Sequence, residues 1–388
     1  MIKCQVPKCS LVINPNGSLA PCCQASKPFG LGTELMLKDY KNIDSFFTSE
    51  FLRDINHKID EKGEHPALCS ECLDQHSNGE RTFMDMVDDT LDPKWKIKGN
   101  KLKYLEITTS NICNQTCTTC NGWFSSAWNI LDQKLMKMYP GIEKELGVEN
   151  VSRHWIVNSE RLQSTELNKI KQALPDINVL CLKGGEPFAD KNNIELLEHL
   201  TKVNPECYVQ IITNFILVGK YIPILKKIKN LDVDASVDGL YNQYEWLRSS
   251  KWDKLLEQMD MYTNELGIRT TVNITVSLYN YTNLHEQIKY WDDSPYTRTL
   301  SATNIVHHPK ISSFKFLTQY YLDYFYDKIP KFNGTVLEKP KSFEHVDREY
   351  YLTAIQKWIS VMNNVRGIEL ENCVPAMNQL EEMILDVS

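Results

Sequence analysis

The stretch Cys113-Asn-Gln-Thr-Cys117-Thr-Thr-Cys120 places three thiols within eight residues. It directly follows residues 101–109, whose side chains alternate in the way typical of a β-strand. A cysteine-rich loop after a strand can turn several sulfurs onto one centre, and thiolates are soft ligands that select zinc, copper(I) or iron–sulfur clusters. The sequence therefore predicts a thiolate metal centre at this loop.

The number of cysteines distinguishes between these metals. Structural zinc is closed by four protein ligands, yet no fourth Cys or His lies close by, and the nearest downstream histidine is His154. A cubane held by three thiolates has one iron without a protein ligand, which is free to bind a substrate or cofactor. The alternative is a set of buried or disulfide-bonded cysteines, but disulfides between cysteines so close in the chain would be strained.

This spacing resembles that of the radical S-adenosylmethionine (SAM) enzymes. The resemblance implies a 4Fe-4S cluster on Cys113, Cys117 and Cys120, with the amino and carboxylate groups of SAM on the unique iron. One electron, from a reductant such as flavodoxin or ferredoxin, would cleave SAM to methionine and a 5′-deoxyadenosyl radical, which abstracts hydrogen from a substrate. Thr119 stands where the family usually has a large apolar residue near the adenine.

Composition sets the broad class. The chain has 388 residues, of which 42% are hydrophobic and 24% charged, which is ordinary for a globular protein. Its net charge of −7 gives no reason to expect a nucleic acid partner. The start lacks the apolar core of a signal peptide, and no stretch approaches the roughly 18 apolar residues of a membrane span. Twelve cysteines without an export signal point to reduced thiols and metal, and hence to the cytoplasm.

The N-terminal segment, residues 1–98, contains half of the cysteines: Cys4, Cys9, Cys22, Cys23, Cys69 and Cys72. Asn14-Pro-Asn-Gly17 is strong turn chemistry between two short apolar runs, which predicts a β-hairpin that brings the first cysteines beside the next pair. A helix is expected over residues 48–59, capped by Thr48 or Ser49 and ended by Gly63. Two hairpin thiols and the later C-x2-C pair would complete a site for zinc or for a second cluster, and spacing alone leaves both open.

The same segment resembles the twitch or SPASM-type segment that accompanies many radical SAM enzymes. That resemblance implies an auxiliary 4Fe-4S cluster on Cys4, Cys22, Cys69 and Cys72, with Cys9 and Cys23 as spares that could replace their neighbours. After the last ligand, Gly79 and Thr82 fit the family pattern, whereas His76 and Met84 stand where Glu and Arg are expected. Enzymes of this kind often modify a peptide or protein, which is the substrate class implied here.

The central segment, residues 101–306, alternates strand-like and helical runs. Six strands are expected, at residues 102–108, 178–182, 207–212, 231–236, 270–276 and 299–306. Repeated β–α alternation predicts a parallel sheet with right-handed crossovers. The expected fold class is α/β, a partial (β/α)6 TIM-type barrel between the Cys-rich domain of residues 1–98 and a C-terminal helical extension of residues 307–388. The active site should then lie at the C-terminal ends of the strands.

Several residues at those ends match family motifs for SAM binding. The second strand ends in a turn whose glycines allow close approach of a ligand to the backbone. The resemblance assigns cofactor contacts to this turn and to small polar residues after the later strands, which are Gly184, Gly185, Glu186, Pro187, Thr213, Asn214, Ser236, Asp238 and Asn280, with Ser277 beside the last.

The long connection, the C-terminal segment and the isolated cysteines carry no motif that points to a specific function. Residues 121–177 form a long connection with Trp123, Trp128, His154 and Trp155, which is either a lid or, slightly favoured, a surface helical elaboration. His307-His308 is read as a loop, the aromatic run 314–325 as packing, and residues 350–362 and 377–385 as helices. Cys181 and Cys207 read as buried small hydrophobes, and Cys373 has no assigned role. The competing function is a non-catalytic metal-binding or scaffold protein with a structural N-terminal module on a degenerate barrel.

Overall fold

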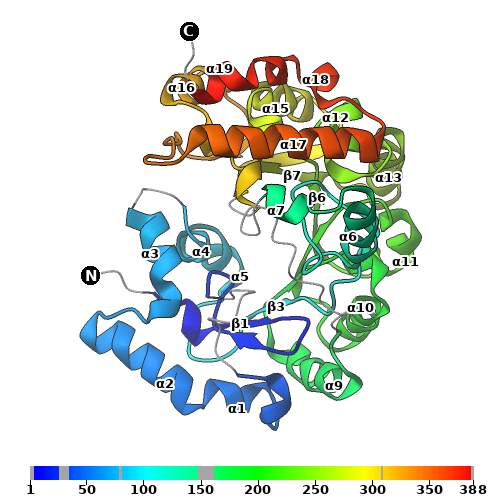
Figure 1. Ribbon diagram of the computed structural model, residues 1–388. Coiled ribbons are helices and arrows are strands. Elements are labelled where there is room, and N and C mark those ends of the chain that lie inside the picture. The colour runs from blue at the N-terminus through cyan, green and yellow to red at the C-terminus, as the bar shows by residue number, and fades with distance from the viewer. Residues whose placement is uncertain (1–3, 26–34, 78–80, 147–160, 307–308, 386–388) are drawn as a thin grey trace. The chain divides into compact units, whose positions relative to one another are not determined.

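The computed structural model describes residues 4–25, 35–77, 81–146, 161–306 and 309–385 (Figure 1). The chain forms two compact units. The first comprises Met1–Ile112, Asn158–Thr213 and Lys220–Val233, and the second Cys113–Val157, Asn214–Gly219 and Asp234–Ser388. Strands alternate with helices and nearly all strand pairs are parallel, so the predicted α/β class with a mostly parallel sheet is confirmed.

The predicted N-terminal hairpin is confirmed. Strands β1 (Ser10–Ile13) and β2 (Leu19–Ala20) pair antiparallel. Their turn closes through the Gly17 N–H, which donates to the Asn14 carbonyl at 2.9 Å, and Gly17 has a φ of +80°, where a side chain would be strained. Strand β1 also pairs in parallel with the first barrel strand, which the sequence did not reveal.

Short helices follow the hairpin. The predicted helix is α2 (Glu50–His57), whose N-cap Ser49 accepts from the Leu52 N–H, and its π-helical continuation ends at Gly63, with φ +64°. The other elements of this segment are η1 (Val6–Lys8), η2 (Leu37–Asp39), α1 (Ile43–Phe47), η3 (Lys58–Lys62), η4 (Ala67–Cys69), α3 (Ser70–Ser77), α4 (Phe83–Met86), η5 (Val87–Leu91) and α5 (Asp92–Trp95).

The strands of the first unit run in the order β2-β1-β3-β4-β5. Strands β3 (Tyr104–Ile107), β4 (Val179–Leu182) and β5 (Tyr208–Thr213) are parallel and lie where the sequence predicts them. One face of β3 and β4 packs on the N-terminal segment, in a cluster of Tyr104, Val179, Cys181, Val6, Phe83, Val87, Leu91 and Ile97. The unit's remaining elements are α9 (Ser164–Ala173), η6 (Leu174–Asp176), η7 (Pro187–Ala189), α10 (Lys191–Val203) and α11 (Ile222–Leu225).

The second unit has the strand order β6-β7-β8-β9. Strands β6 (Asn230–Ser236), β7 (Thr270–Val276) and β8 (Thr297–Ile305) occupy predicted positions, with β6 joining this unit from Asp234 onward. Strand β9 (Gly334–Val336) corrects the expectation of a wholly helical C-terminal segment. It is short, largely exposed and without apolar alternation, so it carries no pattern from which a strand could be predicted.

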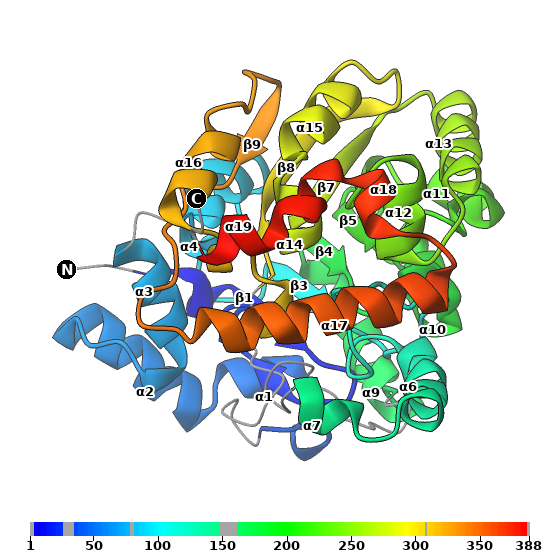
Figure 2. The same ribbon diagram turned by 45° about the horizontal axis from the view of Figure 1, so that its top comes forward.

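Helices complete this unit. The expected terminal helices are α17 (Arg348–Arg366) and α19 (Leu380–Leu385), and α17 contacts α7, α12 and α19 (Figure 2). The aromatic run is one 3-10 turn followed by α16, and Phe314 stacks on Tyr281 with ring centroids 4.4 Å apart, which is packing as predicted. The other elements are α6 (Ser126–Met138), α7 (Ile142–Leu146), α12 (Tyr241–Arg248), α13 (Trp252–Leu266), α14 (Leu278–Tyr281), α15 (Leu284–Asp292), η9 (Lys310–Ser312), η10 (Phe314–Phe316), α16 (Gln319–Tyr326), α18 (Leu370–Cys373), η11 (Pro375–Gln379) and η8 (Val218–Tyr221), which has residues in both units.

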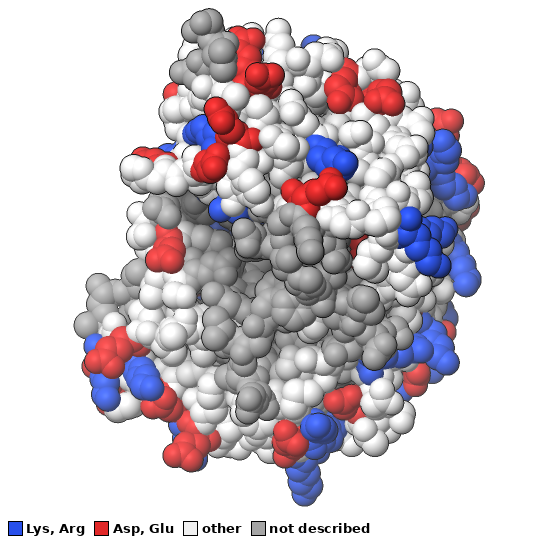
Figure 3. Space-filling model, viewed as in Figure 1, with Lys and Arg blue, Asp and Glu red and all other residues white. Residues whose placement is uncertain are grey.

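Some predicted features lie outside the described residues, namely Gly79, His154, Trp155, His307 and His308. No helix in the described ranges has the length and apolar character needed to cross a bilayer. On the face seen in Figure 3, basic and acidic side chains are interspersed over the described surface.

Candidate functional site

Four thiols of the N-terminal segment lie within electrostatic reach of one another. The pKa of Cys4 is raised to about 12, chiefly by burial and with smaller contributions from Cys72 and Cys69. Burial also raises the pKa of Cys22, with contributions from Cys23, Cys4 and Cys69. The pKa of Cys69 is raised to about 11 by burial and then by Cys72. The hairpin and the C-x2-C turn thus place Cys4 and Cys22 near Cys69, with Cys9 also near Cys4 and Cys23 near Cys22.

The two spare cysteines have different surroundings. Cys9 is fully buried, and its thiol donates to the Gln5 and Val6 carbonyls at 3.5 and 3.6 Å. Burial raises the pKa of Cys23 to about 12, and its charged neighbours are Glu106, which raises the pKa, and Lys183, which lowers it. Among the described residues, no group of three His, Cys, Asp or Glu side chains is arranged around a single metal ion.

The same unit holds a charged pair beside Cys23. Lys183 Nζ lies 2.5 Å from Glu106 Oε1, and the Tyr104 hydroxyl donates to Glu106 Oε2 at 3.3 Å. The Glu106 side chain is 4% exposed, whereas that of Lys183 is 35% exposed. The Glu106 carboxylate is therefore buried, and its partner is the partly exposed ammonium of Lys183, the residue directly before the Gly-Gly-Glu-Pro turn.

The turn after β4 is fixed by its backbone. A Cβ on Gly185 would lie 2.3 Å from the Ile112 carbonyl oxygen, so only glycine fits there. The Glu186 N–H donates to that same carbonyl at 2.7 Å. The buried Glu186 carboxylate accepts from the Phe188 N–H at 3.0 Å and from the Thr213 hydroxyl at 2.7 Å. Two predicted cofactor residues from neighbouring strand ends are thereby joined, and the turn is held against the residue that precedes Cys113.

In the second unit, the three thiols of the central motif lie on one loop, where Cys113 and Cys117 are electrostatic neighbours of Cys120. Cys117 is buried and the other two are half-buried. Burial raises the pKa of Cys120, and Cys117 and Cys113 raise it further, which places both thiols near it. The Cys120 N–H donates to the Cys117 carbonyl at 2.9 Å, so the loop turns tightly between these ligands.

The cysteine loop caps the C-terminal end of α12. The Thr118 N–H donates to the Leu247 carbonyl at 2.7 Å, and its hydroxyl donates to the Trp246 carbonyl at 2.8 Å. The Thr116 N–H donates to Ser249 Oγ at 2.8 Å. These bonds satisfy carbonyls that a helix leaves unpaired, but they also place the loop at the negative end of the helix dipole.

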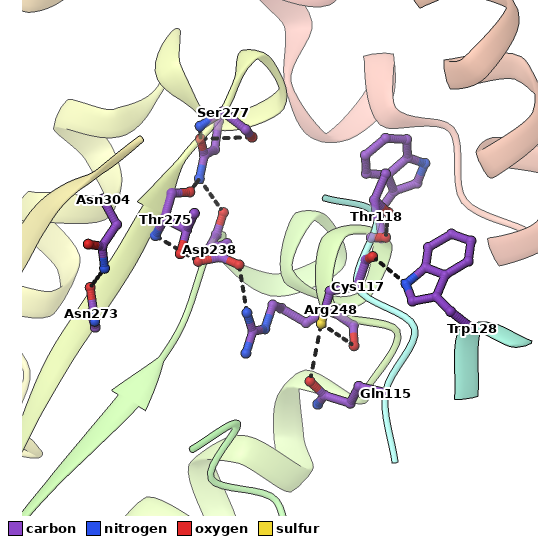
Figure 4. A network of polar contacts seen from close by, with 12 residues as sticks. Gln115, Cys117, Thr118, Trp128, Asp238, Arg248, Asn273, Thr275, Ser277 and Asn304 are labelled. Atoms are coloured by element: carbon purple, nitrogen blue, oxygen red, sulfur yellow. Dashed lines mark hydrogen bonds and ion pairs between the residues drawn. The ribbon is translucent and has the colours of Figure 1, made fainter. Parts of the chain in front are cut away.

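A buried ion pair stands beside this loop (Figure 4). Arg248 Nη1 lies 2.8 Å from Asp238 Oδ2, and Asp238 Oδ1 accepts from the Thr275 N–H at 2.8 Å. Both side chains are nearly inaccessible, at 11% and 2% exposure. The pKa of the Cys117 thiol is raised by burial, lowered by Arg248, raised by Asp238 and lowered by Arg366.

Of the other predicted cofactor residues of this unit, Asn280 belongs to the same polar network. The Asn280 side chain donates to the Asp238 carbonyl at 2.8 Å and accepts from the Ser277 N–H at 2.7 Å. The Asn214 amide donates to Asn114 Oδ1, within the cysteine loop, at 2.7 Å. Ser236 is half-buried at the end of β6. The network therefore links the ends of β6 and β7, and a separate bond joins Asn214 to the cysteine loop.

Sequence reasoning did not find the roles of three residues that support the loop. The Trp128 indole donates to the Cys117 carbonyl at 3.0 Å and the Gln115 side chain accepts from the Cys117 thiol at 3.6 Å (Figure 4). Arg366, from the C-terminal helix α17, donates to the Thr116 carbonyl and hydroxyl. Only Trp128 had been singled out, as part of a lid or a surface helix, whereas it is buried behind the loop.

The comparisons with known proteins agree with this geometry. Residues 107–287 match the model of the radical SAM superfamily. The chain is 25% identical over 161 residues to a GTP 3′,8-cyclase of Peptoclostridium acidaminophilum, which covers 41% of this chain and 42% of that protein. The chain thus spans less than half the length of this curated relative.

Solved structures give distant likenesses. The structure of anSMEcpe with bound AdoMet is 17% identical with a TM-score of 0.41, covering 58% of this chain and 57% of that one. Streptococcus suis SuiB bound to S-adenosylmethionine is 15% identical with a TM-score of 0.41, covering 84% and 71%. The matched span holds the three-cysteine loop, the Gly-Gly-Glu-Pro turn and the polar strand ends, and over these residues the chain is similar to the radical SAM superfamily.

Proposed function

We propose that this chain cleaves SAM reductively and uses the resulting radical to abstract hydrogen from a substrate. The observation that carries the proposal is the loop with Cys113, Cys117 and Cys120 within the span that matches the superfamily model. Three soft thiolates with cationic side chains beside them fit a 4Fe-4S cluster, since the guanidinium groups compensate the negative charge of the ligands. When bound, the cluster and SAM would supply the electron transfer and the 5′-deoxyadenosyl radical.

The residues of this chain would bind and orient the cofactor. The backbone of Gly184 and Gly185 and the carboxylate of Glu186 are suited to an ammonium group such as the SAM amine. Pro187 fixes the turn that follows, because it occupies the first position of η7. The remaining polar residues, Thr213, Asn214, Ser236, Asp238 and Asn280, would contact the ribose and carboxylate of SAM.

We also propose an auxiliary 4Fe-4S cluster on Cys4, Cys22, Cys69 and Cys72. The effects of Cys69 and Cys72 on the pKa of Cys4, and of Cys4 and Cys69 on that of Cys22, support this set, with Cys9 acting on Cys4 and Cys23 on Cys22 as the spares. The substrate class proposed with it is a peptide or protein, and a flavodoxin or ferredoxin is the proposed electron donor.

The test is anaerobic reconstitution followed by dithionite and SAM, with 5′-deoxyadenosine, iron and acid-labile sulfide as the readouts. Cys117→Ala should abolish the product, whereas Cys373→Ala, a solitary thiol on α18, should leave it unchanged. The Cys69→Ala/Cys72→Ala double variant should lose about half of the iron if both sites hold 4Fe-4S clusters. If the double variant keeps all of the iron but loses zinc, the N-terminal site holds zinc and the auxiliary cluster is rejected. Zinc without sulfide in the native chain would reject the proposed enzyme activity.

A further inference from the structure

Arg366 is the last residue of α17 and reaches the cysteine loop through its whole guanidinium group. Its Nη1 donates to the Thr116 hydroxyl at 3.0 Å, its Nη2 to the Thr116 carbonyl, and its Nε to the Trp246 carbonyl at 3.2 Å. Every one of these acceptors is neutral. The only thiol among its charged neighbours is Cys117, on the residue after Thr116.

The charges around Cys117 do not balance. Arg248 is paired with Asp238, so this pair is neutral as a whole. Within the part of the chain that the structure describes, Arg366 has no carboxylate within ion-pair distance. Burial lowers the pKa of Arg366 to about 10, which still leaves the group charged at neutral pH. A partly buried cation without a counterion is unfavourable, so the position suits an anion that binds beside it.

The dipole of α12 also favours a cation near the cysteine loop. The cysteine loop caps the C-terminal end of α12, where the partial charge is negative. Three thiolates placed at that end are disfavoured, and adding an electron to a cluster that they hold is disfavoured further. A cation at Arg366 offsets both effects and does so more strongly for the reduced cluster.

We propose that Arg366, supplied by the C-terminal extension, is a positioning residue that raises the reduction potential of the cluster held by Cys113, Cys117 and Cys120. This inference rests on the proposed function. It assigns a role to α17, which lies outside the span of residues 107–287 that matches the superfamily. A purely structural explanation is that a basic side chain in a last helical turn satisfies carbonyls. The experiment must therefore separate the charge from the hydrogen bonds.

The test is a redox titration of the reconstituted full chain, followed by electron paramagnetic resonance. The signal of the three-cysteine site is identified as the one lost in Cys117→Ala. Arg366→Met removes the charge, and Arg366→Lys keeps the charge but loses the planar fork. Arg348→Met is the matched control, because Arg348 lies on the same helix, about 27 Å away along its axis, and also donates to neutral oxygens.

In Arg366→Met, the ratio of reduced to oxidised cluster at a fixed potential should fall about tenfold, which is a shift of about −59 mV for a one-electron couple. Arg366→Lys should retain most of the native potential, and Arg348→Met all of it. An unchanged potential in Arg366→Met, or an equal shift in Arg366→Lys, would overturn the inference. If Arg366→Met does not take up iron, Arg366→Gln gives the same comparison of charge. A native chain without any cluster signal would instead refute the proposed function.

Discussion

The Asp238–Arg248 pair permits a prediction whose magnitude follows from its burial. Asp238→Asn keeps the shape of the side chain and its contact with the Thr275 N–H, but removes the charge that faces Arg248. The guanidinium is 11% exposed and would be left without a counterion. Breaking a buried pair on one side costs about 3–5 kcal/mol. We therefore expect Asp238→Asn to lower the free energy of unfolding by about that amount.

The measurement is urea unfolding of the reduced, metal-free chain, followed by tryptophan fluorescence. With a slope of about 3 kcal/mol per molar, the midpoint should fall by about 1 M or more. The matched control is Glu257→Gln, which breaks the exposed pair between Lys254 and Glu257 at 2.9 Å. Exposed pairs contribute about 0–1 kcal/mol, so this midpoint should barely move.

The double variant Asp238→Asn/Arg248→Met tests the cause. Because neither buried charge remains, it should be more stable than Asp238→Asn alone. If Arg248→Met instead adds its own full cost to that of Asp238→Asn, the two side chains are not coupled. That result, or a loss under about 1 kcal/mol in Asp238→Asn, would show that the ion pair does not set the stability of this unit.

Three further predictions concern the first unit. Gly185→Ala should destabilise the chain by about 1–3 kcal/mol in a thermal melt, because its Cβ would lie 2.3 Å from the Ile112 carbonyl oxygen. In the metal-free chain at pH 8, mass spectrometry should find Cys69 alkylated about a hundredfold more slowly than a free cysteine, since its pKa is raised to about 11, and the rate should rise with pH up to that value. Lys183→Met should lower the free energy of unfolding in urea by about 1–3 kcal/mol, because the Glu106 carboxylate, 4% exposed, loses its cation. Adding Glu106→Gln to Lys183→Met should restore part of this loss, because the unpaired charge is removed.

Each of these has an outcome that contradicts it. Gly267→Ala is the comparison for the glycine, since nothing lies within 4 Å of its Cβ although its φ is +69°. Equal melting temperatures of Gly185→Ala and Gly267→Ala would show that the Ile112 backbone moves to make room for the added Cβ. Alkylation of Cys69 as fast as that of a small thiol would show that it is not buried. Additive losses in the Lys183 and Glu106 variants would exclude a coupled pair.

Local patterns account for what the sequence could predict. The hairpin at Asn14–Gly17, the helix capped by Ser49 and the six strands from β3 to β8 follow from turn residues, caps and alternation within a few positions. The cysteine spacing likewise predicts a shared site for the three thiols, which stays a prediction. Strand β9 carries no such pattern, and the pairing of β1 with β3 joins segments about 90 residues apart in the sequence.

The support of the candidate site could not be predicted, because it is long-range. Arg366 bonds Thr116 across a separation of 250 residues, and Arg248 reaches Asp238 from the end of a helix that itself carries no motif. The sequence expected the Trp128 segment to be a lid or a surface elaboration. Its helix α6 instead places the indole on the Cys117 carbonyl, a contact that depends on how the helix packs.

These long-range contacts bear on where the functional part of the chain ends. The superfamily match stops at residue 287, and the C-terminal segment from residue 307 was expected to be an extension. Yet Trp358 of α17 stacks near Trp128 with ring centroids 6.3 Å apart, and Asn363 accepts from the Trp246 indole at 2.8 Å. Two of the helices that hold the cysteine loop are thus themselves packed on α17, and Arg366 is the third link. A chain cut after the barrel strands would lose the side of the second unit that positions its three thiols.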